Sequence, residues 1–190
     1  MAMQVRTRPA PTPEDLLQLA RKHFIEGGRL DVAGLGEELG ISRATAYRWA
    51  GNEEELTGRV IASLAEATFR RCVKEARGKG FEKVLDAERR GLRYMATFKP
   101  YRAFLEREEA TTSMRIVASK DGPVQPMQIR QHEEWLRELV GAGEITLAVD
   151  PHTMAYALVR TAEAFLYADL IAGEEIDLDK AVAIMRLLLR

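Results

Sequence analysis

The sequence predicts an all-α fold, with a small N-terminal three-helix head on a larger helical body. Apolar residues recur at helical spacing along most of the chain, glycine and proline separate these segments, and no stretch shows the alternation of a strand. The chain has 190 residues, 46% of them hydrophobic, which is enough to fill a sizeable core. We expect a flexible tail over residues 1–12, a head over 13–52 and a body over 53–190.

Each expected helix has a recognisable start or end. Thr12 and Pro13 are typical of a helix start, and the apolar face that follows ends at Gly27 and Gly28. A long helix begins at Glu53 and continues to about residue 77, where two further glycines follow. The body helices are expected at 81–98, 101–118 with an interruption near 108–112, 126–140, 151–172 and 177–189.

Residues 31–49 predict two short helices joined by a tight turn. Asp31 is a good N-cap for the first helix, and Gly40 can take the left-handed conformation that ends it. Ser42 is a good N-cap for the second helix, which runs to Trp49. Gly36 has no side chain and lets the two helices cross closely. This arrangement is a helix-turn-helix.

The second helix has a face suited to DNA. Ala46 and Trp49 are expected to point inward, which leaves cations, hydroxyls and small residues to meet phosphates and base edges. A surface turn without a nucleic-acid role is the alternative, but exposed Tyr and Arg side chains gain little from such a turn. The candidate DNA-binding residues are Ser42, Arg43, Ala44, Thr45, Tyr47 and Arg48.

The charge of the N-terminal part limits how DNA can be held. Residues 1–50 contain seven Lys or Arg and six Asp or Glu, so specific contacts have to contribute more than bulk charge. Arg6 and Arg8 lie in a tail without acidic residues, which can follow a DNA backbone or reach into a minor groove. A tail that stays free in solution is an equally good interpretation.

The helix-turn-helix resembles that of the TetR family of bacterial repressors. The residues that carry the resemblance stand in register: Gly40, Ile41, Ser42, Thr45, Ala46, Tyr47 and Trp49. The chain departs from the family pattern in two places. Trp49 stands where Phe is usual, and the segment 50–56 is one residue longer and has Glu53 in place of a lysine that can meet a phosphate. The resemblance implies a homodimer that binds double-stranded operator DNA and responds to a small-molecule effector.

Two further segments are similar to the QsdR-type branch of this family, which regulates quorum-signal lactone degradation. These are residues 119–126, and residues 155–173 together with 177–181. The implied effector is a lactone or an acyl lactone. No cofactor is implied.

The last two expected helices predict a dimer interface. The helix over 151–172 is apolar around most of its circumference, so one side can face its own core while another meets a partner. The candidate interface residues are Phe165, Leu166, Ile184, Leu187 and Leu188. Arg160 and Glu163 are three residues apart on this helix, and either a buried salt bridge or a ligand contact fits them.

Aromatic side chains of the body can line a ligand pocket between helices. The candidates are Phe98, Phe104 and Trp135, with Tyr94 and Tyr156 as further contacts, although most aromatic residues in such a body serve core packing. The polar anchor stays open among Glu106, Glu109, His132 and Tyr156.

Other function classes find little support in the sequence. The three histidines stand on different segments without a second ligand at helical spacing, and no phosphate loop or nucleophile elbow is present. His132 fits a solvated helix start. An enzyme would need a catalytic set assembled from distant positions, and an adaptor without DNA binding is supported only by Glu53. The absence of a long apolar run predicts a cytoplasmic protein without a membrane partner.

Overall fold

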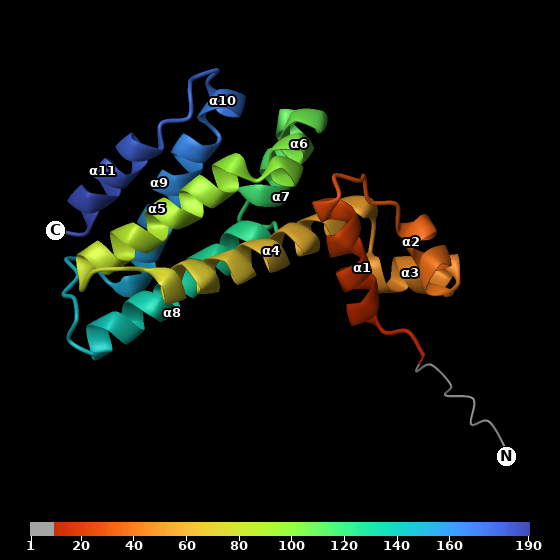
Figure 1. Ribbon diagram of the computed structural model, residues 1–190, viewed down its shortest axis with the longest axis horizontal. Coiled ribbons are helices and arrows are strands. Elements are labelled where there is room, and N and C mark those ends of the chain that lie inside the picture. The colour runs from red at the N-terminus through yellow and green to blue at the C-terminus, as the bar shows by residue number, and fades with distance from the viewer. Residues whose placement is uncertain (1–9) are drawn as a thin grey trace, which may run out of the picture. The chain divides into compact units, whose positions relative to one another are not determined.

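The computed structural model describes residues 10–190, which form eleven helices and no strand (Figure 1). The predicted roles of Arg6 and Arg8 lie outside the described residues. The chain divides into two compact units, an N-terminal unit that reaches to Val60 and a C-terminal unit from Ile61 to Arg190. The all-α prediction is confirmed. The helices are α1 (Pro13–Ile25), α2 (Val32–Leu39), α3 (Arg43–Ala50), α4 (Glu53–Glu75), α5 (Phe81–Thr97), α6 (Lys99–Arg107), α7 (Ala110–Val117), α8 (Val124–Gly141), α9 (Pro151–Leu166), α10 (Ala168–Ile171) and α11 (Leu178–Leu188).

The N-terminal unit begins with three capped helices that contact one another. Thr12 forms a reciprocal capping box with Asp15, which satisfies backbone N–H groups at the start of α1. Asp31 caps α2 by accepting from the backbone N–H of Ala33 at 3.0 Å. Ser42 caps α3 by accepting from the N–H of Thr45 at 3.2 Å. These local signals are the ones that the sequence predicts.

The crossing of α2 and α3 depends on two glycines. Gly40 ends α2 in the left-handed conformation, with φ 72°, and Ile41 donates its N–H to the carbonyl of Gly36 at 2.9 Å. A Cβ added at Gly36 would stand 2.8 Å from the Cβ of Ala46, closer than two carbons can approach. The small residues therefore set how near α3 lies to α2, as the sequence predicts.

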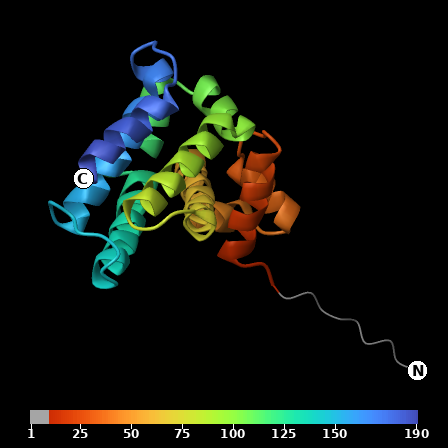
Figure 2. The same cartoon turned by 60° about the vertical axis from the view of Figure 1, so that its left-hand side comes forward.

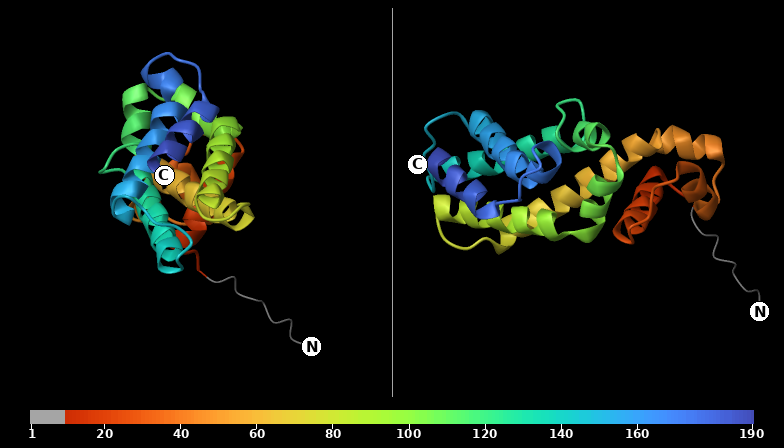
Figure 3. Two further views of the ribbon diagram at one scale, coloured as in Figure 1. Left: turned by 90° about the vertical axis from the view of Figure 1, so that its left-hand side faces the viewer. Right: turned by 90° about the horizontal axis from the view of Figure 1, so that it is seen from above.

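The C-terminal unit packs its long helices side by side (Figure 2). In it α9 contacts both α8 and α11, and α11 also lies against α5 (Figure 3). The core is made of buried aliphatic and aromatic side chains from all of these helices, with Tyr101, Phe104 and Leu136 among the most enclosed. No helix in residues 10–190 is long and apolar enough to cross a membrane.

Three boundaries of the C-terminal unit refine the sequence prediction. The expected interruption near 108–112 is present, because Glu108 is extended between α6 and α7. The helix expected to start at residue 126 starts at Val124, and Pro126 falls in its first turn, where a missing N–H costs no helical hydrogen bond. The single helix expected over 151–172 is wrong: α9 ends at Leu166, and Tyr167 leaves helical geometry before the short α10.

The break after α9 is held by buried polar contacts. The hydroxyl of Tyr167 lies 2.6 Å from that of Tyr101, and both rings are buried. Arg102, which follows Tyr101 on α6, forms an ion pair with Asp169 of α10. The apolar pattern of the segment does not reveal these partners, because they come from residues far away in the sequence.

Candidate nucleic-acid interface and cavity

The second helix of the helix-turn-helix, α3, presents its cations to solvent. Arg43, Ala44 and Arg48 are exposed, whereas Thr45 is half-buried. Ala46 is fully enclosed, as predicted, and Trp49 is only half-buried. The carbonyl of Trp49 accepts from Arg59 of α4 at 2.7 Å, which fixes the end of α3. The helix therefore keeps two positively charged side chains available on a rigid support.

The hydroxyl groups of this face are already engaged. Ser42 donates to the hydroxyl of Thr45 at 3.0 Å. Tyr47 donates to Oε1 of Glu53 at 2.9 Å, and the guanidinium of Arg43 lies 5.5 Å from the centre of the Tyr47 ring. The Tyr47 hydroxyl is therefore paired with the acidic residue at the start of α4, and its contact with DNA stays a prediction.

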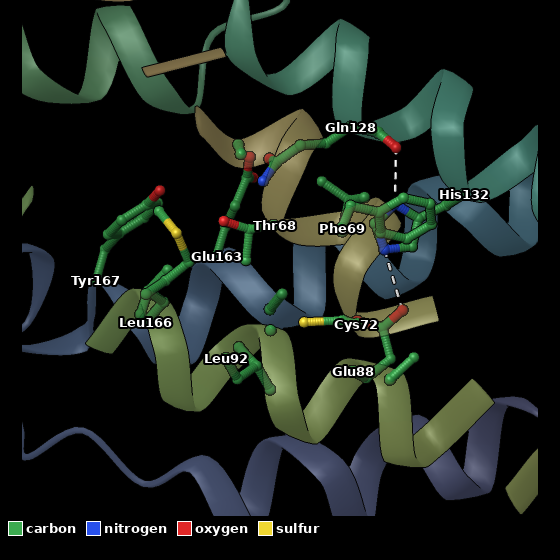
Figure 4. Close-up of a pocket in the computed structure, with 16 residues that line it drawn as sticks. Thr68, Phe69, Cys72, Glu88, Leu92, Gln128, His132, Glu163, Leu166 and Tyr167 are labelled. Carbon is green, nitrogen blue, oxygen red and sulfur yellow. Dashed lines mark hydrogen bonds and ion pairs between the residues drawn. The ribbon is translucent and has the colours of Figure 1, made fainter. Parts of the chain in front are cut away.

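A cavity lies within the C-terminal unit, between α4, α5, α8 and α9 (Figure 4). Its volume is about 80 Å³, well below the ~300–1,000 Å³ of typical ligand pockets. A larger ligand would have to move the surrounding helices apart. The lining is mostly apolar, with a few polar groups: Ala65, Thr68, Phe69, Cys72, Ala87, Glu88, Gly91, Leu92, Met95, Gln128, His132, Val159, Ala162, Glu163, Leu166 and Tyr167.

A buried ion pair forms one side of this cavity. Nε2 of His132 lies 3.0 Å from Oε1 of Glu88, and the two side chains are 10% and 7% exposed. Nδ1 of His132 lies 2.7 Å from the carbonyl oxygen of Gln128, so both ring nitrogens face acceptors (Figure 4). Burial acts to lower the pKa of His132, but Glu88 and the Gln128 carbonyl outweigh it, and the pKa of His132 is raised above its ordinary value. The raised pKa and the two acceptors both favour the charged form of the imidazole.

This burial corrects the interpretation of His132 as part of a solvated helix start. Helix α8 begins eight residues earlier, at Val124, and His132 lies in its interior with its ring 4.5 Å from that of Phe69. The two glutamates that follow His132 are typical of a solvent-facing first turn, but here they lie in the middle of α8.

A second carboxylate, Glu163, lines the same cavity. Its two oxygens accept from Nε2 of Gln125 at 2.9 and 3.0 Å, and Arg160 donates to it at 2.7 Å. The side chain of Glu163 is 7% exposed and that of Arg160 47%. Burial raises the pKa of the Glu163 carboxyl, while Gln125 and Arg160 act in the opposite direction. The salt bridge considered from the sequence is thus present, and its acidic partner also faces the cavity.

The aromatic residues predicted to line a pocket lie elsewhere. Tyr94 is exposed and stacks on Phe98 at 5.3 Å. Phe104 is enclosed in the core, where it stacks on a tyrosine of the same helix. Tyr156 is half-exposed on α9. Trp135 is buried in a T-shaped contact with Phe69 and is not among the residues that line the cavity. The structure brings none of the five to the cavity.

Of the four candidate polar anchors, His132 lines the cavity. Glu106, Glu109 and Tyr156 do not. Small residues such as Ala65, Gly91 and Cys72 stand in the wall among larger apolar ones, and their short side chains leave space there. A sequence signal for this was present in Gly91, a glycine in the middle of a helix with no atom within 4 Å of the Cβ position. Among residues 10–190 no group of three metal-ligating side chains gathers.

The predicted interface residues do not all lie on one accessible face. Leu187 and Ile184 of α11 are 64% and 40% exposed. Phe165 and Leu188 are half-buried. Leu166 is 6% exposed and lines the cavity, so its own subunit already covers the side chain assigned to the interface.

Comparisons with known proteins address the fold and the function class. Residues 79–190 match the family described as tetracyclin repressor-like, C-terminal domain. The structure of the R. erythropolis transcriptional repressor QsdR matches with a TM-score of 0.86 and 32% identity, over 94% of this chain and 96% of that one. The fatty acid degradation regulator FadR from Bacillus halodurans matches with a TM-score of 0.56 and 16% identity, over 96% and 97%, which bears on the fold alone. No curated protein matches.

Proposed function

Because this chain belongs to the TetR family of transcriptional regulators, we propose that it binds an inverted-repeat operator as a dimer and that a small, mostly apolar effector changes its DNA affinity. Proteins of this family are DNA-binding regulators rather than enzymes. The observation that carries the proposal is α3, a capped helix with Arg43 and Arg48 exposed on a rigid support. A role on DNA also implies that the protein works in the cytoplasm.

Operator binding is proposed to combine two kinds of contact. Arg48 and Arg43 supply cations that can contact guanine edges or phosphates, and Ser42, Ala44, Thr45 and Tyr47 complete the surface. In a two-fold symmetric dimer the two α3 helices should reach successive major grooves, about 34–36 Å apart. The operator is then an inverted repeat whose half-sites have this spacing.

The test is a titration of the purified protein with a fragment of its own promoter and with random DNA of equal length. The promoter fragment should bind more tightly, and Arg48→Ala should relax sequence preference at one position of each half-site, by about 1–3 kcal/mol. Arg130→Ala, which removes an exposed arginine of α8, is the control. Equal affinity for both DNAs at several salt concentrations would contradict the proposal.

The effector is proposed to bind in the cavity of the C-terminal unit. Helix α4 provides four lining residues there, and its first residue, Glu53, accepts the hydroxyl proton of Tyr47 on α3. A ligand that displaces α4 can therefore change the surroundings of the DNA-binding helix, by as much as its affinities for the two states differ. A lactone is the effector that the sequence resemblance implies. Calorimetry of the full chain with γ-hexalactone tests whether a lactone binds.

A further inference from the structure

The cavity wall has more acidic side chains than side chains that can carry a positive charge. Glu88 and Glu163 both line it, and His132 is the only lining residue that can carry a positive charge. Both ring nitrogens of His132 are directed at protein acceptors, Glu88 and the Gln128 carbonyl. Arg160, the cation next to Glu163, is half-exposed and does not line the cavity. The wall therefore has no N–H cation left to donate to a ligand carboxylate.

The two carboxylates differ in how completely they are satisfied. Glu163 accepts from both Gln125 and Arg160. Glu88 is 7% exposed, and its Oε1 has no hydrogen-bond partner of good geometry in the described part of the chain, although the His132 ring lies 3.0 Å away. A buried carboxylate oxygen gains most from an additional charged donor. Within the described residues Glu88 has one charged partner, the His132 ring, and it is thus the less completely satisfied carboxylate of this wall.

We propose that the cavity takes an apolar molecule that carries a protonated amine, with the ammonium group donating to Glu88 and the hydrocarbon part against Leu92, Met95 and Leu166. The inference rests on the proposed effector site and ranks an amine ahead of a neutral lactone and both ahead of a carboxylate. Glu163 contributes through its negative charge without a direct contact. A carboxylate of the same length would find no free N–H cation in this wall and would lie beside two carboxylates that already hold its cations, which is unfavourable.

The experiment compares four molecules of six carbons that differ in their polar group: hexylamine, hexan-1-ol, γ-hexalactone and hexanoate. At neutral pH the amine is protonated, as lysine is, and the acid is ionised. Binding to the full chain is measured by calorimetry and by the melting temperature. Hexylamine should bind at least about tenfold more tightly than hexanoate, which is the ratio expected for gaining rather than losing one charged hydrogen bond.

Variants then locate the amine. Glu88→Gln should lower the affinity for hexylamine about tenfold, and Glu163→Gln by a smaller factor through its charge alone. Glu134→Gln is the matched control, because it removes the same charge from an exposed position of α8. If Glu88→Gln weakens amine binding no more than this control does, the assigned contact is wrong. The comparison of four molecules uses the unaltered chain, so it holds even where a variant folds poorly.

The outcomes separate this inference from the proposed function. Hexanoate binding as tightly as hexylamine, or no binding of any of the four at millimolar concentration, would overturn the amine-binding cavity. Operator affinity of the ligand-free protein is measured on the same preparation. If that affinity is retained while hexanoate is preferred, only the present inference fails. If promoter DNA is not bound at all, the regulator itself is wrong.

Discussion

The Tyr47 hydroxyl has one proton to donate, and in the unbound protein Glu53 accepts it at 2.9 Å. A phosphate oxygen at this place has to replace the Glu53 carboxylate and also meets its negative charge. We expect Glu53→Gln to raise operator affinity about threefold, the effect of removing one like charge at a few ångströms in water. Fluorescence titration at low salt measures the change, and Glu37→Gln, an equal loss of charge on α2, is the control. Weaker binding would mean that Glu53 holds α3 in its DNA-binding geometry.

His132 makes the stability of the C-terminal unit depend on pH. The pKa of its imidazole is raised above the ordinary 6.5, because Glu88 and the Gln128 carbonyl outweigh the opposing effect of burial. The stabilisation is therefore fully present below about pH 6.5 and is lost as the pH rises through the folded pKa. The urea concentration at the midpoint of unfolding should therefore decrease as the pH is raised from about 6 to about 8.5.

The matching variant is His132→Gln, which leaves Glu88 buried without its cation. It should cost about 3–5 kcal/mol near pH 6 and clearly less near pH 8.5. His23→Gln, which removes a half-exposed ring that pairs with Glu38 in the N-terminal unit, is the control. Burial also raises the pKa of Glu163 above its ordinary 4.5. The stability that its protonated form contributes is therefore lost at lower pH, as the pH rises above about 4.5. An unaltered slope in His132→Gln would rule out this imidazole as the titrating group.

At the scale of single helices, the sequence predicts helix ends from neighbouring residues but does not predict contacts between residues far apart in the chain. The ends of α1, α2 and α3 depend on side chains that cap the backbone within three residues, so they can be read from the sequence. The cavity depends on pairs such as Glu88 with His132, which stand on different helices far apart in the chain. Phe98, Phe104 and Trp135 are predicted as its lining from the helices on which they lie, but the helix alone does not decide which side chains reach the cavity, where Ala65 and Gly91 leave space.

The exposed face of α11 provides the test of dimerisation. Leu187 and Ile184 are exposed on a helix that packs against α9, and large apolar side chains in such positions favour a partner surface. Leu187→Asp should give monomers at micromolar concentration in sedimentation velocity and weaken operator binding. Ile25→Asp, at an equally apolar exposed position at the end of α1 in the N-terminal unit, should stay dimeric. A monomeric unaltered protein would remove the basis for a two-fold symmetric operator.

At the scale of the whole molecule, regulation requires that occupancy of the cavity and the affinity for DNA are linked. Ala65→Leu fills the cavity from α4, so hexylamine should lose its effect on operator affinity while the ligand-free affinity stays the same. The expected effect in the unaltered protein is about 5- to 150-fold, a coupling of about 1–3 kcal/mol. Ala67→Leu adds the same side chain to an exposed position of α4 and should keep the full response. A full response in Ala65→Leu would place the effector outside this cavity.

The chain has two tryptophans, and each compact unit contains one of them. Trp49 is half-buried at the end of α3, and Trp135 is buried with its edge on Phe69, a wall residue of the cavity. The protein therefore has a natural optical reporter in each unit. Replacing either indole with Phe leaves a single emitter, so unfolding of the two units can be recorded separately. In the variant that keeps Trp135, emission should change when the cavity is occupied, without any attached dye.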